Sequence, residues 1–151
     1  DRRAARPMVP GTVARGLLKT DTAFWTGKVA GKPVLEFPIP VTKELIERGR
    51  DRYNIYCTPC HGMTGYADGM IVTRGLKKPP SYHTDALREQ PVGHFYDVIT
   101  NGNGSMASYA SRIPAKDRWA IVAYVRVLQQ SQNVKVTELT ADEKAKVEAA
   151  Q

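Results

Sequence analysis

The chain has 151 residues, of which 42% are hydrophobic, and its formal net charge is +7. This length suits one domain, and no apolar run approaches the roughly 20 residues that a transmembrane helix needs, so none is expected in this stretch. The positive charges are spread out and not interleaved with aromatic residues, so we expect no nucleic-acid partner. The two cysteines are too few for a disulfide framework or a four-thiolate zinc site.

Residues 1–41 look like an extended arm. The Phe-Pro-Ile-Pro run at residues 37–40 forces an extended path, because each proline biases the residue before it away from the helical region. Phe24 and Trp25 add more apolar surface than a solvated tail would carry. We therefore expect residues 1–41 to be a docking segment that packs on something.

The first helix is predicted from about Lys43 to Cys57. Thr42 is a candidate N-cap, Glu44 suits the first turn, and apolar or small residues recur at helical spacing. Residues 62–90 are rich in glycine and proline, and we expect them to form loops with one short helix. Few large aliphatic residues precede residue 90, which suggests that something other than side chains fills part of the interior.

Two later segments have helical periodicity. The first runs from Val92 to Thr100 and stops at the Asn-Gly-Asn-Gly sequence of residues 101–104. The second runs from Ala115 to about Gln130, with Pro114 expected in its first turn. Apolar residues surround most of this last helix, so we expect it to be buried.

The sequence thus divides into the arm of residues 1–41, an all-α domain of residues 42–132 and a polar tail of residues 133–151. Within the tail, Thr140 and Glu143 form a capping-box signature that predicts a small terminal helix.

Both cysteines lie in the run Cys-Thr-Pro-Cys-His at residues 57–61. This is the known signature for covalent attachment of a c-type haem. The thiols of Cys57 and Cys60 can each add to one vinyl group, and the imidazole of His61 then falls under the iron as an axial ligand.

Three other uses of this motif are weaker. A thioredoxin-like dithiol opens a helix after a strand, whereas this motif closes a helix in a chain without alternating strands. A zinc site needs four ligands, and no second cluster accompanies Cys57, Cys60 and His61. A plain disulfide is disfavoured to a similar degree. We therefore favour haem.

The second axial ligand is predicted to be Met106, in a glycine-rich loop before the last helix. Met63 follows the histidine by two residues and spans only about 7 Å of chain, too little to reach the far side of a macrocycle. Met70 could reach only through a taut loop. His83 and His94 are competitors, but each is more often a surface or satisfied histidine than a ligand. A thioether ligand would raise the reduction potential.

The ligating histidine also needs an acceptor for its second ring N–H. One candidate is the backbone carbonyl of Pro79, in a loop stiffened by Pro80. Spacing alone leaves equally open that these prolines only turn the chain.

From about Thr42 to Gln130 the chain resembles the class I c-type cytochromes. The resemblance implies an all-α fold of roughly three to five helices around one covalently bound haem c. It also implies that the Pro79 carbonyl is the partner of His61.

In that family the first and last helices cross at a small residue of one and an aromatic residue of the other. Gly49 against Tyr124 matches this pattern, and the resemblance places Tyr53 and Trp119 in the same helix contact. Two helix axes can approach closely only where one of them lacks a side chain.

Residues 8–16, 37–42 and 47–57 also resemble the mono-haem cytochrome c subunit of bacterial alternative complex III, a quinol-oxidising membrane complex. The resemblance implies an electron-transfer subunit without bond chemistry of its own. It would take electrons from a multi-haem or iron–sulfur subunit and pass them to a terminal oxidase or a soluble carrier.

The same resemblance implies a location on the periplasmic side of the bacterial cytoplasmic membrane. Covalent haem attachment takes place outside the cytoplasm, so we expect a removed segment upstream of the residues given. The resemblance also implies a lipid anchor upstream of them. The alternatives are a free periplasmic electron shuttle, and a haem enzyme or gas sensor whose sixth position is open.

Overall fold

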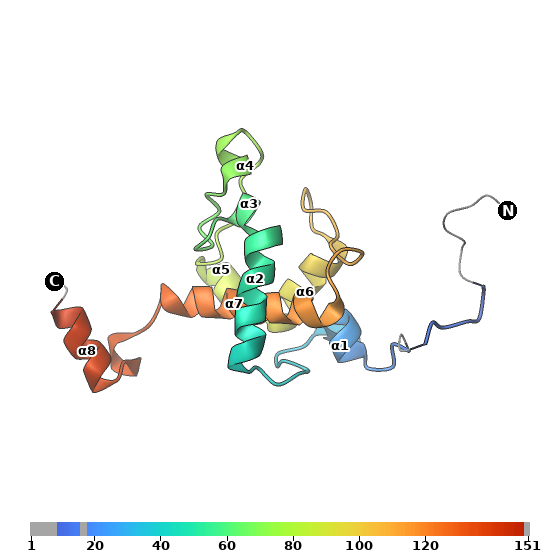
Figure 1. Ribbon diagram of the computed structural model, residues 1–151, viewed down its shortest axis with the longest axis horizontal. Coiled ribbons are helices and arrows are strands. Elements are labelled where there is room, and N and C mark those ends of the chain that lie inside the picture. Colours follow the sequence, from blue (N-terminus) through green and yellow to red (C-terminus); the bar gives the residue numbers. More distant parts are fainter. Residues whose placement is uncertain (1–8, 16–17, 150–151) are drawn as a thin grey trace.

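The computed structural model describes residues 9–15 and 18–149 (Figure 1). Parts of the predicted arm, residues 1–8, 16 and 17, lie outside the described residues, as do residues 150–151 of the tail. The described helices and strands follow in the order α1 Thr22–Thr26, β1 Lys28–Val29, β2 Lys32–Pro33, α2 Lys43–Tyr56, α3 Thr58–His61, α4 Met70–Thr73, α5 Asp85–Arg88, α6 Val92–Asn101, α7 Ala115–Ser131, the 3-10 turn Val136–Glu138 and α8 Ala141–Glu148. The predicted all-α class is confirmed, with a short β1–β2 hairpin added.

Helix α2 begins where the sequence predicts. The Oγ1 of Thr42 accepts the Leu45 N–H at 3.2 Å and satisfies one of the free donors of the first turn. Near the same end, the Arg48 guanidinium donates two hydrogen bonds to the Asp117 carboxylate in the first turn of α7, at 3.0 and 2.7 Å. This paired contact ties the start of α2 to the start of α7.

Helices α2 and α7 cross over each other in the centre of the fold (Figure 1). A Cβ added to Gly49 of α2 would overlap the carbonyl of Ala120 in α7 and lie 3.1 Å from Cβ of Tyr124. The rings of Tyr53 and Tyr124 meet edge to face at 5.3 Å. The structure therefore brings Gly49, Tyr53 and Tyr124 together at one crossing.

Trp119, which the resemblance placed in the same helix contact, lies on α7 but packs against α6. Its ring stacks on Tyr96 of α6 with the ring centroids 4.2 Å apart, and its Nε1 donates to the Phe24 carbonyl at 2.8 Å. The Phe37 ring meets it edge to face at 5.9 Å. Trp119 thus joins α7 to α6 and to the N-terminal segment, and its side chain is completely buried.

Residues 21–41 fold onto the chain's own domain. Asp21 caps the short helix α1, and the β1–β2 hairpin pairs Val29 with Lys32. The backbone then contacts α6, where the Gly93 N–H donates to the Val34 carbonyl at 3.0 Å. The aromatic residues that predicted a packed segment, Phe24 and Trp25, are half-buried and pack against the core of this chain. The apolar side chains of Val9, Val13 and Leu18, nearer the N-terminus, are exposed.

Three details of the helices differ from the predictions. Helix α2 ends at Tyr56, and the cysteine motif forms a separate turn, α3, because Pro59 has no N–H to continue the hydrogen-bond ladder of α2. Pro114 is the N-cap of α7 and not a residue of its first turn. Residues 62–90 contain two short helices, α4 and α5, where one was predicted.

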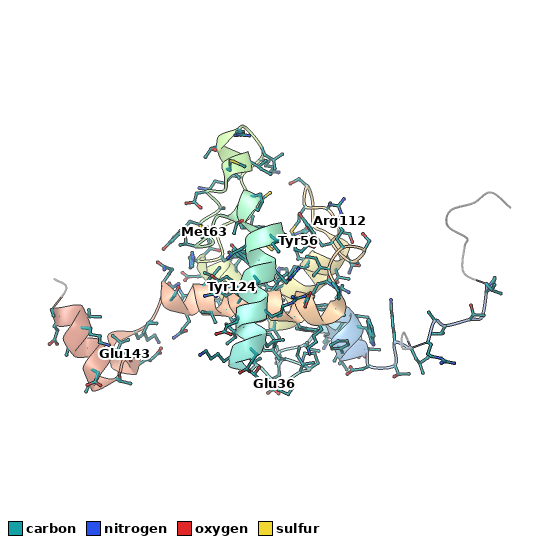
Figure 2. The ribbon with its side chains drawn as sticks, in the orientation of Figure 1. Glu36, Tyr56, Met63, Arg112, Tyr124 and Glu143 are labelled. Atoms are coloured by element: carbon teal, nitrogen blue, oxygen red, sulfur yellow. The ribbon has the colours of Figure 1, made fainter. Side chains whose placement is uncertain are left out.

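The tail forms the predicted terminal helix. Thr140 and Glu143 make the capping box of α8, which is confirmed. Helix α8 stands apart from the crossed helices, and Glu143 marks it at one end of the molecule (Figure 2). Among the described residues, no helix has both the length and the apolar character needed to cross a membrane.

Candidate functional site

A cavity of about 460 Å³ opens beside α3, a size within the usual range for small-molecule and cofactor sites. Its walls come from the end of α2, the turn α3, residues 76–82, helix α6 and the loop before α7. The cavity brings together five residues singled out by the sequence: Cys57, Cys60, His61, Pro79 and Met106. Cys57, Cys60 and His61 are neighbours in the sequence, whereas Pro79 and Met106 lie up to 49 residues from Cys57 and are brought to the cavity by the fold.

Cys57 and Cys60 are free thiols on the wall of this cavity. Burial and, to a smaller extent, the neighbouring Cys60 raise the pKa of Cys57 to about 12. At neutral pH this thiol is therefore protonated. Within residues 9–15 and 18–149, no group of three or more His, Cys, Asp or Glu side chains is placed so that it could hold a metal ion.

His61 is the last residue of α3 and is only 8% exposed. Burial lowers its pKa to about 4, so the imidazole is neutral at physiological pH and has a nitrogen lone pair available for a metal. Its Nδ1 is buried without a hydrogen-bond partner. Pro79 lines the same cavity, but its carbonyl makes no hydrogen bond to that nitrogen.

An unpartnered, neutral imidazole beside two free thiols in a largely apolar cavity fits a covalently attached haem. The other ring nitrogen, Nε2, could bind a haem iron, and the buried Nδ1–H would then need an acceptor from the chain. The residues present therefore suit the group that the motif predicts.

Met106 lies in the loop between α6 and α7 and lines the cavity. The loop is held by a small backbone hairpin in which Asn103 and Met106 exchange two N–H to carbonyl hydrogen bonds of 3.0 Å each. Gly102 has φ +81°, and an added Cβ would lie 2.5 Å from the Met106 carbonyl oxygen. The glycine is thus required for the turn that places Met106.

The competing ligands are placed differently. Met63 and Met70 are 71% and 58% exposed and are not among the residues that line the cavity. The Nε2 of His83 is hydrogen bonded to the Thr64 carbonyl at 2.7 Å, away from the cavity wall. His94 does line the cavity. Met106 and His94 are therefore the two candidates for the second iron ligand that lie on its wall.

Several aromatic residues of the cavity were not singled out from the sequence. Tyr56 at the end of α2 lies toward the loop that carries Arg112 (Figure 2), and its ring meets Tyr109 of that loop at 6.3 Å. Tyr82 stacks on the His61 imidazole with ring centroids 4.7 Å apart. Only the position of Tyr82 shortly after Pro79 could have hinted at its place near the histidine.

The turn after His61 is anchored from α2. The buried Tyr53 hydroxyl donates to the Gly62 carbonyl at 2.8 Å, and burial raises the pKa of this hydroxyl. A Cβ at Gly62, which has φ +75°, would clash with the Asp68 carboxylate. Tyr53 thus joins the helix crossing to the turn that carries the cavity's histidine.

Comparison with known proteins points to one family. Residues 44–125 match the family model described as cytochrome c oxidase, cbb3-type, subunit III. Among curated proteins, none matches the chain.

One similar solved structure is a chain of the reducing HAO-like protein complex of Kuenenia stuttgartiensis. It is 24% identical, with a TM-score of 0.54, over 71% of this chain and 54% of that chain. This chain therefore spans about half the length of that protein, and the likeness supports the fold alone.

Proposed function

Because the chain belongs to the cytochrome c family described as cbb3-type cytochrome c oxidase subunit III, we propose that it transfers electrons on one haem c attached to Cys57 and Cys60. The class I cytochrome c fold predicted from the sequence agrees with this membership and with the helical structure. The observation that carries the proposal is the cavity that joins both free thiols to the neutral, unpartnered His61. When bound, a haem supplies an iron that accepts and releases one electron.

In this proposal, His61 and Met106 provide the axial ligands. His61 is fixed at the end of α3 and buried, so it needs little rearrangement to act as a ligand. Met106 is held by the Asn103–Met106 hairpin, which restricts the conformation of the loop even without a haem. The Pro79 carbonyl lies on the same cavity wall, and we propose that it accepts the Nδ1–H of His61 when the haem is bound.

Alanine at Met106 tests this ligand assignment. We expect Met106→Ala to keep the haem but lose the weak far-red sulfur-to-iron band of the ferric protein, and to lower the reduction potential, because the thioether ligand is gone. Absorption spectroscopy and potentiometric titration measure these effects. Met63→Ala is the matched control, since Met63 is exposed and not on the cavity wall. A far-red band that survives in Met106→Ala would contradict the assignment. So would a ferric protein that lacks the band and whose spectrum changes in His94→Ala but not in Met106→Ala.

We further propose that the chain is a subunit of a membrane quinol-oxidising complex similar to alternative complex III, on the periplasmic side of the bacterial cytoplasmic membrane. A multi-haem or iron–sulfur subunit would supply the electrons, and a terminal oxidase or soluble carrier would receive them. The support is the sequence resemblance of residues 8–16, 37–42 and 47–57, together with the exposed Val9, Val13 and Leu18 of the arm.

Removing residues 1–19 tests the docking role of the arm. This truncation leaves Asp21, the cap of α1, and the contacts of Phe24 and Val34 with the domain. We expect the shortened protein to fold and carry haem but to fail to co-purify with a membrane complex from its native host. Co-purification equal to that of the full chain would contradict a docking arm. Failure of the full chain itself to co-purify would favour the free shuttle.

A further inference from the structure

We infer that Tyr82 and Gln129 are positioning residues for His61, with Gln129 acting through Tyr82 to set the orientation of the imidazole. The inference deepens the proposed function and rests on it, because it concerns the histidine proposed to bind the iron. The side chains that carry it come from helix α7 and from the segment after Pro79, neither of which adjoins the cysteine motif in the sequence.

The Tyr82 ring lies flat against the His61 imidazole. Their centroids are 4.7 Å apart and their planes differ by 14°. Phe95 supports the tyrosine from another side, edge to face at 6.3 Å. The Tyr82 N–H donates to the Gly65 carbonyl at 3.0 Å, in the turn that follows the histidine. The ring is therefore held both by its own backbone and by its neighbours.

Gln129 of α7 reaches the same segment with its amide. Its Nε2 donates to the Tyr82 carbonyl at 2.8 Å, and its Oε1 accepts from Arg126 Nη1 at 2.7 Å. Because one end of the amide must donate and the other must accept, the two contacts fix its orientation. Gln129 is only 5% exposed, so loss of the Tyr82 contact would leave buried polar groups unpaired.

Arg126 completes the support. Its guanidinium lies 4.9 Å from the Phe95 ring centroid and also donates to the carbonyls of Arg88 and Gln90. It therefore links α7 to both the end of α5 and the ring that packs on Tyr82. Gln129 and Arg126 together hold the Tyr82 segment against the long, buried helix of the domain.

The imidazole of His61 depends on this support. The torsion that turns a histidine ring has a broad energy minimum, so the ring plane must be fixed by its contacts. No hydrogen bond fixes it at Nδ1 in this structure, whereas the tyrosine covers one ring face. Stacking acts on the face and leaves the edge nitrogen free for the Pro79 carbonyl. Partners of this kind around a ligand commonly tune the metal.

The experiment uses the full chain with its haem attached. The nuclear magnetic resonance shifts of the haem methyl groups in the ferric protein report the orientation of the axial imidazole. We expect Tyr82→Leu and Gln129→Leu to change the order or spread of these shifts, and Tyr82→Phe, which keeps the ring, to restore the native pattern. Gln130→Leu is the matched control, because Gln130 is the exposed neighbour on α7 and contacts Glu138 instead.

A double variant tests the direction of the effect. In the Tyr82→Leu background, Gln129→Leu should cause no further change in the methyl pattern, because the ring that transmits its effect is absent. Native shifts in Gln129→Leu, or an equal change in Gln130→Leu, would overturn the role of Gln129. Native shifts in Tyr82→Leu would overturn the whole inference. A native chain without covalent haem would instead refute the proposed function.

Discussion

Alanine at both Cys57 and Cys60 is expected to abolish covalent haem attachment completely. Each thiol is proposed to form one thioether bond to a vinyl carbon, and no other cysteine exists in the chain to replace them. Mass spectrometry of the denatured protein and haem staining of denaturing gels measure the loss. We expect the double variant to have the mass of the polypeptide alone.

The matched control for the cysteine variant is Thr58→Ala, in the same turn. Thr58 has no thiol, and its hydroxyl only donates to the Asn54 carbonyl at 2.7 Å. This variant should keep the covalent haem. Haem that stays bound to the double cysteine variant after denaturation would contradict the attachment site.

Valine at Gly49 is expected to lower the free energy of unfolding by about 3 kcal/mol, at the upper end for an overpacked core. The added side chain would overlap the Ala120 carbonyl, which belongs to the hydrogen-bonded backbone of the buried helix α7 and cannot turn aside. Cβ of Tyr124 closes the other side at 3.1 Å. Denaturant unfolding of the haem-loaded protein measures the change.

The control for this variant is Arg50→Val, at the next position of α2. It introduces the same β-branched residue on an exposed part of the helix, so it accounts for the loss of helix propensity alone. We expect a cost of well under half that of Gly49→Val. Equal stability of the two variants would show that the helices do not require a glycine where they cross.

The main helices were predictable because local signals and periodicity agree there. The Thr42 cap starts α2, and the Asn-Gly-Asn-Gly run ends α6 within one residue of the expected position. The segments that were harder to predict depend on distant contacts. Trp119 and Phe24 are joined by a hydrogen bond across 95 residues, and no local pattern reveals that residues 21–41 cover α6 and α7.

In the site, too, some residues could be predicted from local sequence and others depend on distant contacts. The motif at residues 57–61 identifies the two thiols and the histidine from spacing alone, because the chemistry requires them to be adjacent. Tyr82 and Gln129 carry no such pattern. A buried glutamine acquires its role only when α7 packs beside the segment after Pro79, which is a property of the tertiary structure.

We propose that this chain is an electron carrier whose haem iron has two protein ligands, His61 and Met106. The ferric absorption spectrum of the purified native protein, followed by exposure of the reduced protein to carbon monoxide, distinguishes this carrier from a haem protein with an open site. We predict a low-spin spectrum with the weak far-red sulfur-to-iron band, and no rapid binding of carbon monoxide, because both protein ligands are in place. A high-spin ferric spectrum with rapid carbon monoxide binding would show instead a haem enzyme or gas sensor with an open sixth position.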